Sequence, residues 1–455
     1  MPVAEDVVRQ FASSLKGELI REGDAAYQVA RKIWNAMIDR RPAMIVRCWG
    51  TYDVVNAVNF ARYHGIQLSV RGGGHNVSGN AVCDGGLVID LSTMKEIRVD
   101  PERRVAFAQG GVTWGELDAK TQEHGLATTG GIVSSTGIAG LTLGGGLGWL
   151  MRKHGLTCDS LLGAEIVTAD GRILRADARE NSDLFWAVRG GGGNFGVVTS
   201  FEYQLHPVGK ILGGPLIHPF ERAQEVLRFF RKFTEGAPDE LMAFAALTHS
   251  PQGARVALLL VAYFGEIEDG ERVLRPLREF GPPLVDQVGP IAYTNLQRIL
   301  DPAYGPGARN YWKSNFLTDL SDEAIRTIVQ HYAEFDSPQS DVVIELGGGA
   351  VGRVGKEETA YDHREGHLNF EILARWTDPS EDEANRAWAR RFWEAMQPFS
   401  TGRVYVNYLG EEREEGFERI KSAYGPDKYE RLVALKRKYD PENLFRFNQN
   451  IKPGG

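Results

Sequence analysis

The segment Val70-Arg71-Gly72-Gly73-Gly74-His75-Asn76 carries most of the information about the fold of this chain. Residues 66–70 (IQLSV), in front of the glycines, alternate between apolar and polar side chains and predict a short β-strand. Three consecutive glycines after a strand let successive backbone N–H groups point into one concavity, and such a nest binds an anion. The segment therefore predicts an anion-binding loop that ends in an imidazole. A tight turn with an incidental histidine is the alternative that these residues alone leave open.

A second glycine-rich segment follows at residues 128–148, TTGGIVSSTGIAGLTLGGGLG, and it predicts a long loop of small residues. Small side chains, hydroxyls and free amides form a wall that can lie against a flat ring system and a pyrophosphate. Two such loops, each after a β segment, suit a long dinucleotide bound in an extended form between two subdomains. Solvent-exposed turns alone would not need so many of the 53 glycines in so few segments.

The most obvious glycine motif is misleading. Gly191, Gly193 and Gly196 in GGGGNFG satisfy the G-x-G-x-x-G pattern of dinucleotide-binding proteins. That fingerprint has to follow a strand and open a helix. Here a predicted helix (residues 181–190) precedes the motif and a predicted strand (residues 195–205) follows it, so no Rossmann site is expected.

The remaining pattern predicts an α+β architecture. In the first half, we expect helices at 53–64, ending at Gly65, and at 113–125 with a Thr113/Glu116 capping box, strands at 87–91 and 104–111, and a hairpin around Asp170-Gly171. From about residue 208, predicted helices at 220–233 and 269–280 accompany predicted strands at 254–265, 341–354 and 368–376, which indicates an antiparallel sheet. The tail predicts a strand at 403–409 and a helix near 428–439.

The composition excludes several classes of protein. With 455 residues, the chain is too long for one ordinary hydrophobic core, so two domains are expected. The formal net charge of -8, without a basic block, argues against nucleic acid as a partner. No apolar run reaches the roughly 18 residues of a membrane-spanning helix, and the first residues contain no signal-peptide core. Three scattered cysteines do not make a disulfide framework, so a cytoplasmic protein is expected.

Three segments together resemble a known family: RGGGHNVSG, the stretch from GGIVSSTGIAGLTLGGGLG to AEIVTADG, and DLFWAVRGGGGNFGVVTSFEYQL. They resemble the vanillyl-alcohol-oxidase-like (PCMH-type) FAD enzymes, and with the tail YVNYL…YDPENLFRFNQNI the chain resembles the berberine-bridge-enzyme-like oxidases. The resemblance implies an FAD-binding domain of two α+β subdomains at 1–207. It also implies a substrate domain at 208–402, with an antiparallel sheet covered by helices, and a segment at 403–455 that returns to the first domain.

The resemblance implies that His75 bonds covalently to the 8α-methyl carbon of the flavin, and that the glycine loop cradles the pyrophosphate. The full set of residues expected to bind FAD is His75, Arg71, Gly72, Gly73, Gly74, Asn76, Gly79, Gly111, Thr129, Gly130, Ser135, Thr136, Gly137, Gly140, Ile166, Tyr405, Asn407 and Asn448.

The chain departs from the family pattern at two positions. Many relatives attach the flavin a second time through a cysteine, but Val133 stands at that position and Cys158 lies 25 residues further on, so a single link is expected. Leu141 replaces a histidine that several relatives place near the flavin pyrimidine. The resemblance implies that Thr136 stands where relatives control the access of O2 to the flavin. Threonine is small but polar and branched, so this residue alone does not decide whether O2 is admitted or excluded.

Tyr405 and Asn407 are the main catalytic candidates. They lie two residues apart on a predicted strand and so share a face, and the resemblance implies that the tyrosine points at the substrate above the flavin. A tyrosine with a pKa near 10 needs help to act as a base at neutral pH. Lys313, on one strand face with Tyr311, would supply a cation; a solvated surface lysine is the alternative. His363 and His367 lie in a predicted loop without metal-site spacing, so no metal is expected.

The function expected from these features is an FAD-dependent oxidase. It would oxidise a small organic substrate (an alcohol, sugar, amine or phenolic compound) and pass the electrons to O2, giving H2O2. A flavin dehydrogenase with another acceptor and a flavin-binding protein without significant catalysis are the two alternatives. A monomer or homodimer is expected.

Overall fold

The N-terminal part of the chain contains two main sheets. The structure, a computed structural model, describes residues 3–366 and 368–454. The first sheet has the order β1 (Glu18–Arg21), β2 (Met44–Arg47), β4 (Leu87–Asp90), β3 (Leu68–Arg71). The β2, β4 and β3 strands are parallel, so β3 delivers the chain directly to Gly72 at the carboxyl edge of the sheet.

The second sheet is antiparallel. Its order is β5 (Ile97–Asp100), β6 (Val105–Gln109), β10 (Val197–Gln204), β8 (Leu161–Val167), β9 (Ile173–Asp177). The predicted hairpin around Asp170-Gly171 is the β8–β9 connection, in which Gly171 has φ 79°. Strands β7 (Leu126–Ala127) and β11 (His206–Pro207) form a separate antiparallel ribbon of two strands.

The helices of this part include three that the sequence predicts, at 53–64, 113–125 and 181–190. In chain order the helices are α1 (Glu5–Ser13), α2 (Tyr27–Ala30), α3 (Thr51–His64), α4 (Trp114–Gln122), α5 (Ile138–Leu143), α6 (Met151–His154) and α7 (Ser182–Ala187). The α3 helix ends at Gly65 with φ 63°, and α4 begins with the predicted capping box, since the Thr113 backbone N–H donates to Glu116 at 2.8 Å. The expectation that 128–148 is all loop is wrong, because this segment contains α5. Ile138, Ala139 and Leu143 are buried on one side of that helix and stabilise it.

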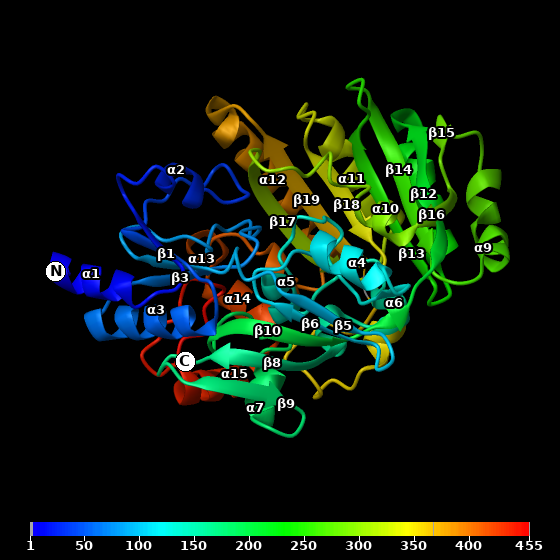
Figure 1. Ribbon diagram of the computed structural model, residues 1–455. Helices are drawn as coiled ribbons and strands as arrows, with labels where there is room; N and C mark the ends of the chain where they lie inside the picture. Colours follow the sequence, from blue (N-terminus) through cyan, green and yellow to red (C-terminus); the bar gives the residue numbers. More distant parts are fainter. Residues whose placement is uncertain (1–2, 367, 455) are drawn as a thin grey trace.

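Residues 210–376 build one eight-stranded antiparallel sheet (Figure 1). Its order is β15 (Val285–Asp286), β12 (Lys210–Pro219), β14 (Arg255–Tyr263), β13 (Leu241–His249), β18 (Asp341–Glu345), β19 (Leu368–Trp376), β17 (Arg309–Leu317), with β16 (Gly289–Ala292) also paired to β12. The accompanying helices are α8 (Ala223–Thr234), α9 (Ile267–Glu279), α10 (Tyr293–Gln297), α11 (Asp322–Ala333) and α12 (Asp382–Met396).

The two faces of this sheet have different neighbours. Helices α8, α11 and α12 cover one face, where Tyr311, Ile372 and Phe392 belong to a common apolar core. The other face is turned toward the N-terminal part of the chain, as Figure 1 shows. Because side chains alternate along a strand, every second residue of β12, β13, β14, β18 and β19 points to that second face.

The tail returns to the N-terminal part as α13 (Glu412–Glu415), α14 (Phe417–Tyr424) and α15 (Pro426–Tyr439). Asp183 of α7 holds α15 through Lys438 Nζ at 2.6 Å and the Tyr439 hydroxyl at 2.9 Å. The predicted strand at 403–409 is wrong: after Arg403, whose carbonyl still accepts from Phe316, the chain turns through a 3₁₀ segment at Val406–Tyr408. Among the described residues, no helix is both long and apolar enough to cross a membrane.

Candidate active site

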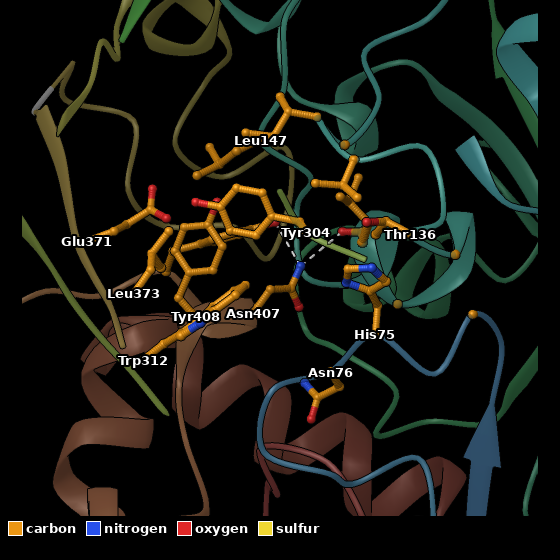
Figure 2. A pocket seen from close by; sticks show the side chains of 18 of the residues that line it. His75, Asn76, Thr136, Leu147, Tyr304, Trp312, Glu371, Leu373, Asn407 and Tyr408 are labelled. Atoms are coloured by element: carbon orange, nitrogen blue, oxygen red, sulfur yellow. Dashed lines mark hydrogen bonds between the residues drawn. The ribbon is translucent and has the colours of Figure 1, made fainter. Parts of the chain in front are cut away.

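A cavity of about 540 Å³ lies between the glycine loops and the face of the eight-stranded sheet that α8, α11 and α12 do not cover (Figure 2). The predicted site residues that line it are His75, Gly72, Gly73, Gly74, Asn76, Thr136, Gly137, Gly140, Tyr405, Asn407 and Asn448. Three segments that are far apart in the sequence, around residues 72–76, 131–147 and 405–408, therefore form one wall.

The two glycine loops contact each other through their backbones. A Cβ on Gly73 would come within 2.6 Å of Gly137 Cα, so no side chain fits at this crossing. Within the described part of the chain, the backbone N–H groups of residues 72–76 donate to no protein acceptor. Free N–H groups beside a cavity are suited to a phosphate.

His75 lies at the edge of this wall. Its Nε2 is 3.0 Å from Ser135 Oγ, and its ring stacks on Trp34 with the ring centroids 4.4 Å apart. Burial lowers the pKa of His75 to about 4, against the smaller opposite influence of Asp301. The imidazole is therefore neutral at neutral pH and held in one orientation.

Tyr405 and Asn407 meet in the 3₁₀ turn. The Tyr405 hydroxyl accepts from the Gly146 backbone N–H at 3.0 Å and from Asn407 Nδ2 at 2.7 Å. The bond from Gly146 ties the turn to the glycine wall, and the bond from Asn407 lies within the turn. Burial raises the pKa of Tyr405 and outweighs the hydrogen bonds that lower it, so the phenol keeps its proton at neutral pH.

The sheet side of the cavity was not identified from the sequence. Its lining side chains alternate along the strands: Pro215 and Ile217; Phe244, Ala246 and Thr248; Val256, Leu258 and Leu260; Asp341, Val343 and Glu345; Glu371 and Leu373; and Trp312. An isolated acidic residue in an apolar strand, as in DVVIE and NFEIL, is the signal that would have pointed to Glu345 and Glu371.

Lys313 and Tyr311 do not face Tyr405, which contradicts the prediction. They lie on the helix-covered face of β17, and Trp312 between them lines the cavity. Lys313 Nζ is 2.7 Å from Glu415 Oε1 in a buried ion pair, and the Tyr311 hydroxyl accepts from Arg390. The shared face was predicted correctly, but α12 packs against that face.

Other predicted FAD-binding residues stand behind the cavity wall and shape it. Arg71 donates to Asp90 at 3.1 Å, and Thr129 donates to the Gly155 carbonyl at 2.7 Å. Gly111 and Gly130 are glycines because Leu91 and Trp114 pack against their backbones. Gly79 lies against Ile38, and Ile166 is buried in the core. These residues support the wall, and their direct contact with the cofactor stays a prediction.

The structure shows where the residues that depart from the family pattern lie. Val133 and Leu141 line the cavity, whereas Cys158 is fully buried in the N-terminal core, where burial raises the pKa of its thiol. His363 Nε2–H donates to the Ala423 carbonyl at 2.9 Å, and His367 lies outside the described residues.

One further glycine segment reaches the cavity. Gly192, Gly193 and Gly196, from the motif that does not open a helix, line it beside Asn448. The order of α7 and β10 around them agrees with the rejection of a Rossmann site. The motif therefore lines the pocket as a loop between a helix and a strand, and not as the strand-to-helix turn that its pattern suggests.

Comparison with known proteins supports this picture. Residues 42–177 match the family model of an FAD binding domain, and residues 404–452 match the model "Berberine and berberine like". An FAD-linked oxidoreductase of Dictyostelium discoideum is 32% identical over 99% of this chain and 98% of that protein. The (R)-6-hydroxynicotine oxidase of Paenarthrobacter nicotinovorans is 31% identical, over 97% and 98%.

The fold agrees as closely. The crystal structure of 6-hydroxy-D-nicotine oxidase from Arthrobacter nicotinovorans superposes with a TM-score of 0.89 at 30% identity, covering 97% of this chain and 98% of that one. The matches span both the glycine loops and the tail that carries Tyr405 and Asn407. This chain therefore belongs to the berberine-bridge-enzyme-like family of FAD-linked oxidoreductases.

Proposed function

We propose that this protein is an oxidase that holds FAD through a single covalent bond to His75, removes a hydride from a small organic substrate, and passes the electrons to O2 to give H2O2. The observation that carries the proposal is the convergence of His75, two glycine loops and the Tyr405–Asn407 pair on one cavity. The relative named as an oxidase supports O2 as the acceptor.

The residues of the cavity fit FAD. The free N–H groups of residues 72–76 suit the pyrophosphate. Asn448 Oδ1 and Gln449 Oε1 are buried acceptors without a donor in the described chain, and both residues line the cavity. Hydroxyl and imide N–H groups of the cofactor are donors of the required kind. When bound, FAD supplies the ring system that accepts the hydride.

The state of His75 suits a nucleophile. A neutral imidazole has a free lone pair, and Nε2 is engaged with Ser135 Oγ. In the described part of the chain no hydrogen bond reaches Nδ1, which is therefore the nitrogen available for attachment. Val133, where a second attachment would need a thiol, has no nucleophile, so one link is expected.

Tyr405 and Asn407 act as hydrogen-bonding groups in this proposal. Because the Tyr405 oxygen already accepts two hydrogen bonds, its own proton is left to donate to an acceptor in the cavity. The protonated phenol can orient a substrate oxygen or nitrogen and hold it against the hydride-accepting ring.

Denaturation of the purified holoenzyme tests the attachment. The yellow colour should stay with acid-precipitated protein, and a tryptic peptide that contains His75 should carry the flavin mass. His75→Ala should release its flavin on precipitation while Cys158→Ala keeps it. Complete release of flavin from the wild type would contradict the covalent link.

The electron acceptor is tested separately. After anaerobic reduction by a substrate, admission of air should restore the 450 nm band quickly with one H2O2 per turnover. Slow reoxidation in air would indicate a dehydrogenase, and the absence of bleaching by any alcohol, sugar, amine or phenol would indicate a flavin-binding protein. The cytoplasmic location and the monomeric or homodimeric state remain predictions from the sequence.

A further inference from the structure

Two buried carboxyl groups lie next to each other on the sheet wall of the cavity. Glu345 of β18 pairs in register with Asn369 of β19, and Glu371 is two residues further along the same face. Asn369 Nδ2 donates to Glu345 Oε2 at 3.0 Å and to Glu371 Oε1 at 2.9 Å. One amide group therefore bridges both carboxyls, which are 2% and 6% exposed as whole residues.

Within residues 3–366 and 368–454, neither Glu345 nor Glu371 forms an ion pair. Among the described residues that line the cavity there is no lysine and no arginine. Arg375, the guanidinium on the same strand, lies over the Tyr304 ring at 4.5 Å. Burial raises the pKa of Asp341, and Arg375 opposes part of that rise. Asp341 itself accepts a hydrogen bond from the Tyr304 hydroxyl at 2.7 Å, so it is already engaged.

Of the other described ionisable groups around the pair, Arg375 alone carries a positive charge at neutral pH. They are Asp341, Arg375, His363, Tyr304, Tyr361 and Tyr408. Burial lowers the pKa of His363 to about 4, so it is neutral, and burial raises the pKa of the three phenols. Arg375 lies over the Tyr304 ring and forms no ion pair with Glu345 or Glu371 among the described residues.

Burial raises the pKa of both Glu345 and Glu371, and each charge opposes the other. Two adjacent carboxyls in such a place cannot both ionise, so the pair keeps a proton that it gives up when a cation arrives. A second feature also calls for a donor: Asn369 Oδ1 is buried and has no hydrogen-bond partner in the described chain.

Aromatic rings complete the surroundings. Trp312 and Tyr408 meet edge to face with ring centroids 6.0 Å apart, and both line the cavity with Glu371. In the view of Figure 2, Glu371 lies at one end of the pocket and His75 at the other, with Tyr408 and Asn407 between them. Aromatic faces attract a cation, and the apolar strand residues around them suit a carbon skeleton.

We propose that the substrate is an amine with an apolar or aromatic body, which enters as a monocation and places its ammonium group at Glu345, Glu371 and Asn369. This inference rests on the proposed oxidase function. The ionised carboxylate of the pair takes one proton from the ammonium group, which leaves a neutral amine. The C–H bond next to nitrogen then breaks with transfer of a hydride to the flavin, giving an iminium cation.

The electron count closes with the proposed acceptor, O2. The hydride carries two electrons to the flavin, and O2 with one further proton takes them away as H2O2. Water hydrolyses the iminium ion to a carbonyl compound and an ammonium ion, which carries the positive charge away. Substrate and immediate product are both monocations, so the same carboxyl pair is complementary to both.

A matched pair of ligands tests the site in the holoenzyme. Benzylamine, which is protonated at pH 7, should bind about 10–100-fold more tightly than benzyl alcohol, the range for a charge-assisted hydrogen bond. Benzyltrimethylammonium should compete for binding without bleaching the flavin, because it has no proton to give up. Calorimetry at pH 7 in buffers of different ionisation enthalpy should show protons released when either cation binds, and none with the alcohol.

Charge-removing variants locate the effect. Glu345→Gln and Glu371→Gln keep the shape of the side chain, and each should abolish most of the proton release and of the preference for amine over alcohol. Asp341→Asn, on the same wall but bonded to Tyr304, should keep the proton release. Flavin content and urea unfolding of each variant establish that it is folded. An unchanged preference in both glutamine variants would overturn the proposal.

The failure of this inference is distinguishable from that of the oxidase function. Bleaching by benzyl alcohol as readily as by benzylamine, without proton release, would overturn the amine site and leave the oxidase. Binding of both cations with proton release, but no bleaching by any amine and none by the alcohol, would support the cation site and contradict the oxidase.

Discussion

Gly73 and Gly137 lie in backbone contact where the two cofactor loops cross: a Cβ on Gly73 would be 2.6 Å from Gly137 Cα, and a Cβ on Gly137 would be 2.8 Å from Gly73 Cα. Neither neighbour is the end of a flexible side chain, so the loops themselves would have to separate. The crossing brings the loop of His75 against the loop of Ser135 and Thr136. The position of His75 therefore depends on the absence of a side chain at both Gly73 and Gly137.

Alanine at either glycine should destabilise the protein. We expect Gly73→Ala and Gly137→Ala each to cost about 1–3 kcal/mol, the usual range for overpacking, as measured by urea unfolding. Gly209→Ala is the control, because an added methyl there meets no atom within 4 Å. Variants at the crossing that are as stable as this control would show that the loops are not in firm contact.

Ser135 should control how fast the flavin becomes attached. Its hydroxyl holds Nε2 of His75 at 3.0 Å, and Trp34 supports the ring from the other side. In Ser135→Ala the ring loses this bond, so FAD should still bind but the covalent fraction should form more slowly when apoprotein is mixed with FAD. Ser135→Thr keeps a hydroxyl and should restore the rate. Equal rates of attachment in the alanine variant and the wild type would make Ser135 irrelevant to the orientation of His75.

Tyr405→Phe should slow flavin reduction and spare the fold. It removes a hydroxyl that accepts from Gly146 and Asn407 and has its own proton to donate. A donor directed at the reacting groups is worth about 10²–10³-fold in rate, to be measured by anaerobic stopped flow at saturating substrate. Reduction at the wild-type rate would make Tyr405 a packing residue.

Lys313→Met should lower the stability of the protein and leave the rate of flavin reduction unchanged, the reverse of the expectation for Tyr405→Phe. Because Lys313 pairs with buried Glu415 on the helix-covered face of β17, its loss should lower stability by up to about 3 kcal/mol. Arg419, which also pairs with Glu415 at 2.7 Å, should reduce that cost. The rate of flavin reduction should stay close to wild type. A large loss of rate in a folded variant would restore the catalytic role that the sequence suggested.

The glycine loops could be predicted from the sequence because their requirement is local. A run such as Gly72–Gly74 after a strand has few uses other than a close approach of backbone to a ligand, and Gly137 and Gly140 repeat that signal. The strand alternation that placed Tyr311 and Lys313 on one face was also correct. The loops and the alternation both follow from neighbouring residues.

The sheet wall could not be predicted in the same way. Which face of β17 meets the cavity depends on where α12 packs, more than 60 residues later in the chain, and this decides between Lys313 and Trp312. The turn at Val406–Tyr408 reads as a strand because apolar and polar residues alternate, but the bonds of Tyr405 to Gly146 and Asn407 determine its path. Distant contacts decide both cases.

The last prediction concerns oxygen. Thr136 lines the cavity beside His75, and family resemblance places it at the flavin edge that O2 must reach (Figure 2). O2 is small and uncharged, so the bulk of the side chain should control its approach more than polarity does. Thr136→Leu adds volume at this edge, and the sheet wall with Glu345 and Glu371 is untouched. Reoxidation in air should therefore slow far more than reduction by substrate, as stopped-flow measurement of both half-reactions will show. Thr136→Val keeps the shape without the hydroxyl and should reoxidise at nearly the wild-type rate. A slow valine variant would mean that the hydroxyl matters rather than the volume, and equal rates in all three proteins would mean that another residue controls the access of oxygen.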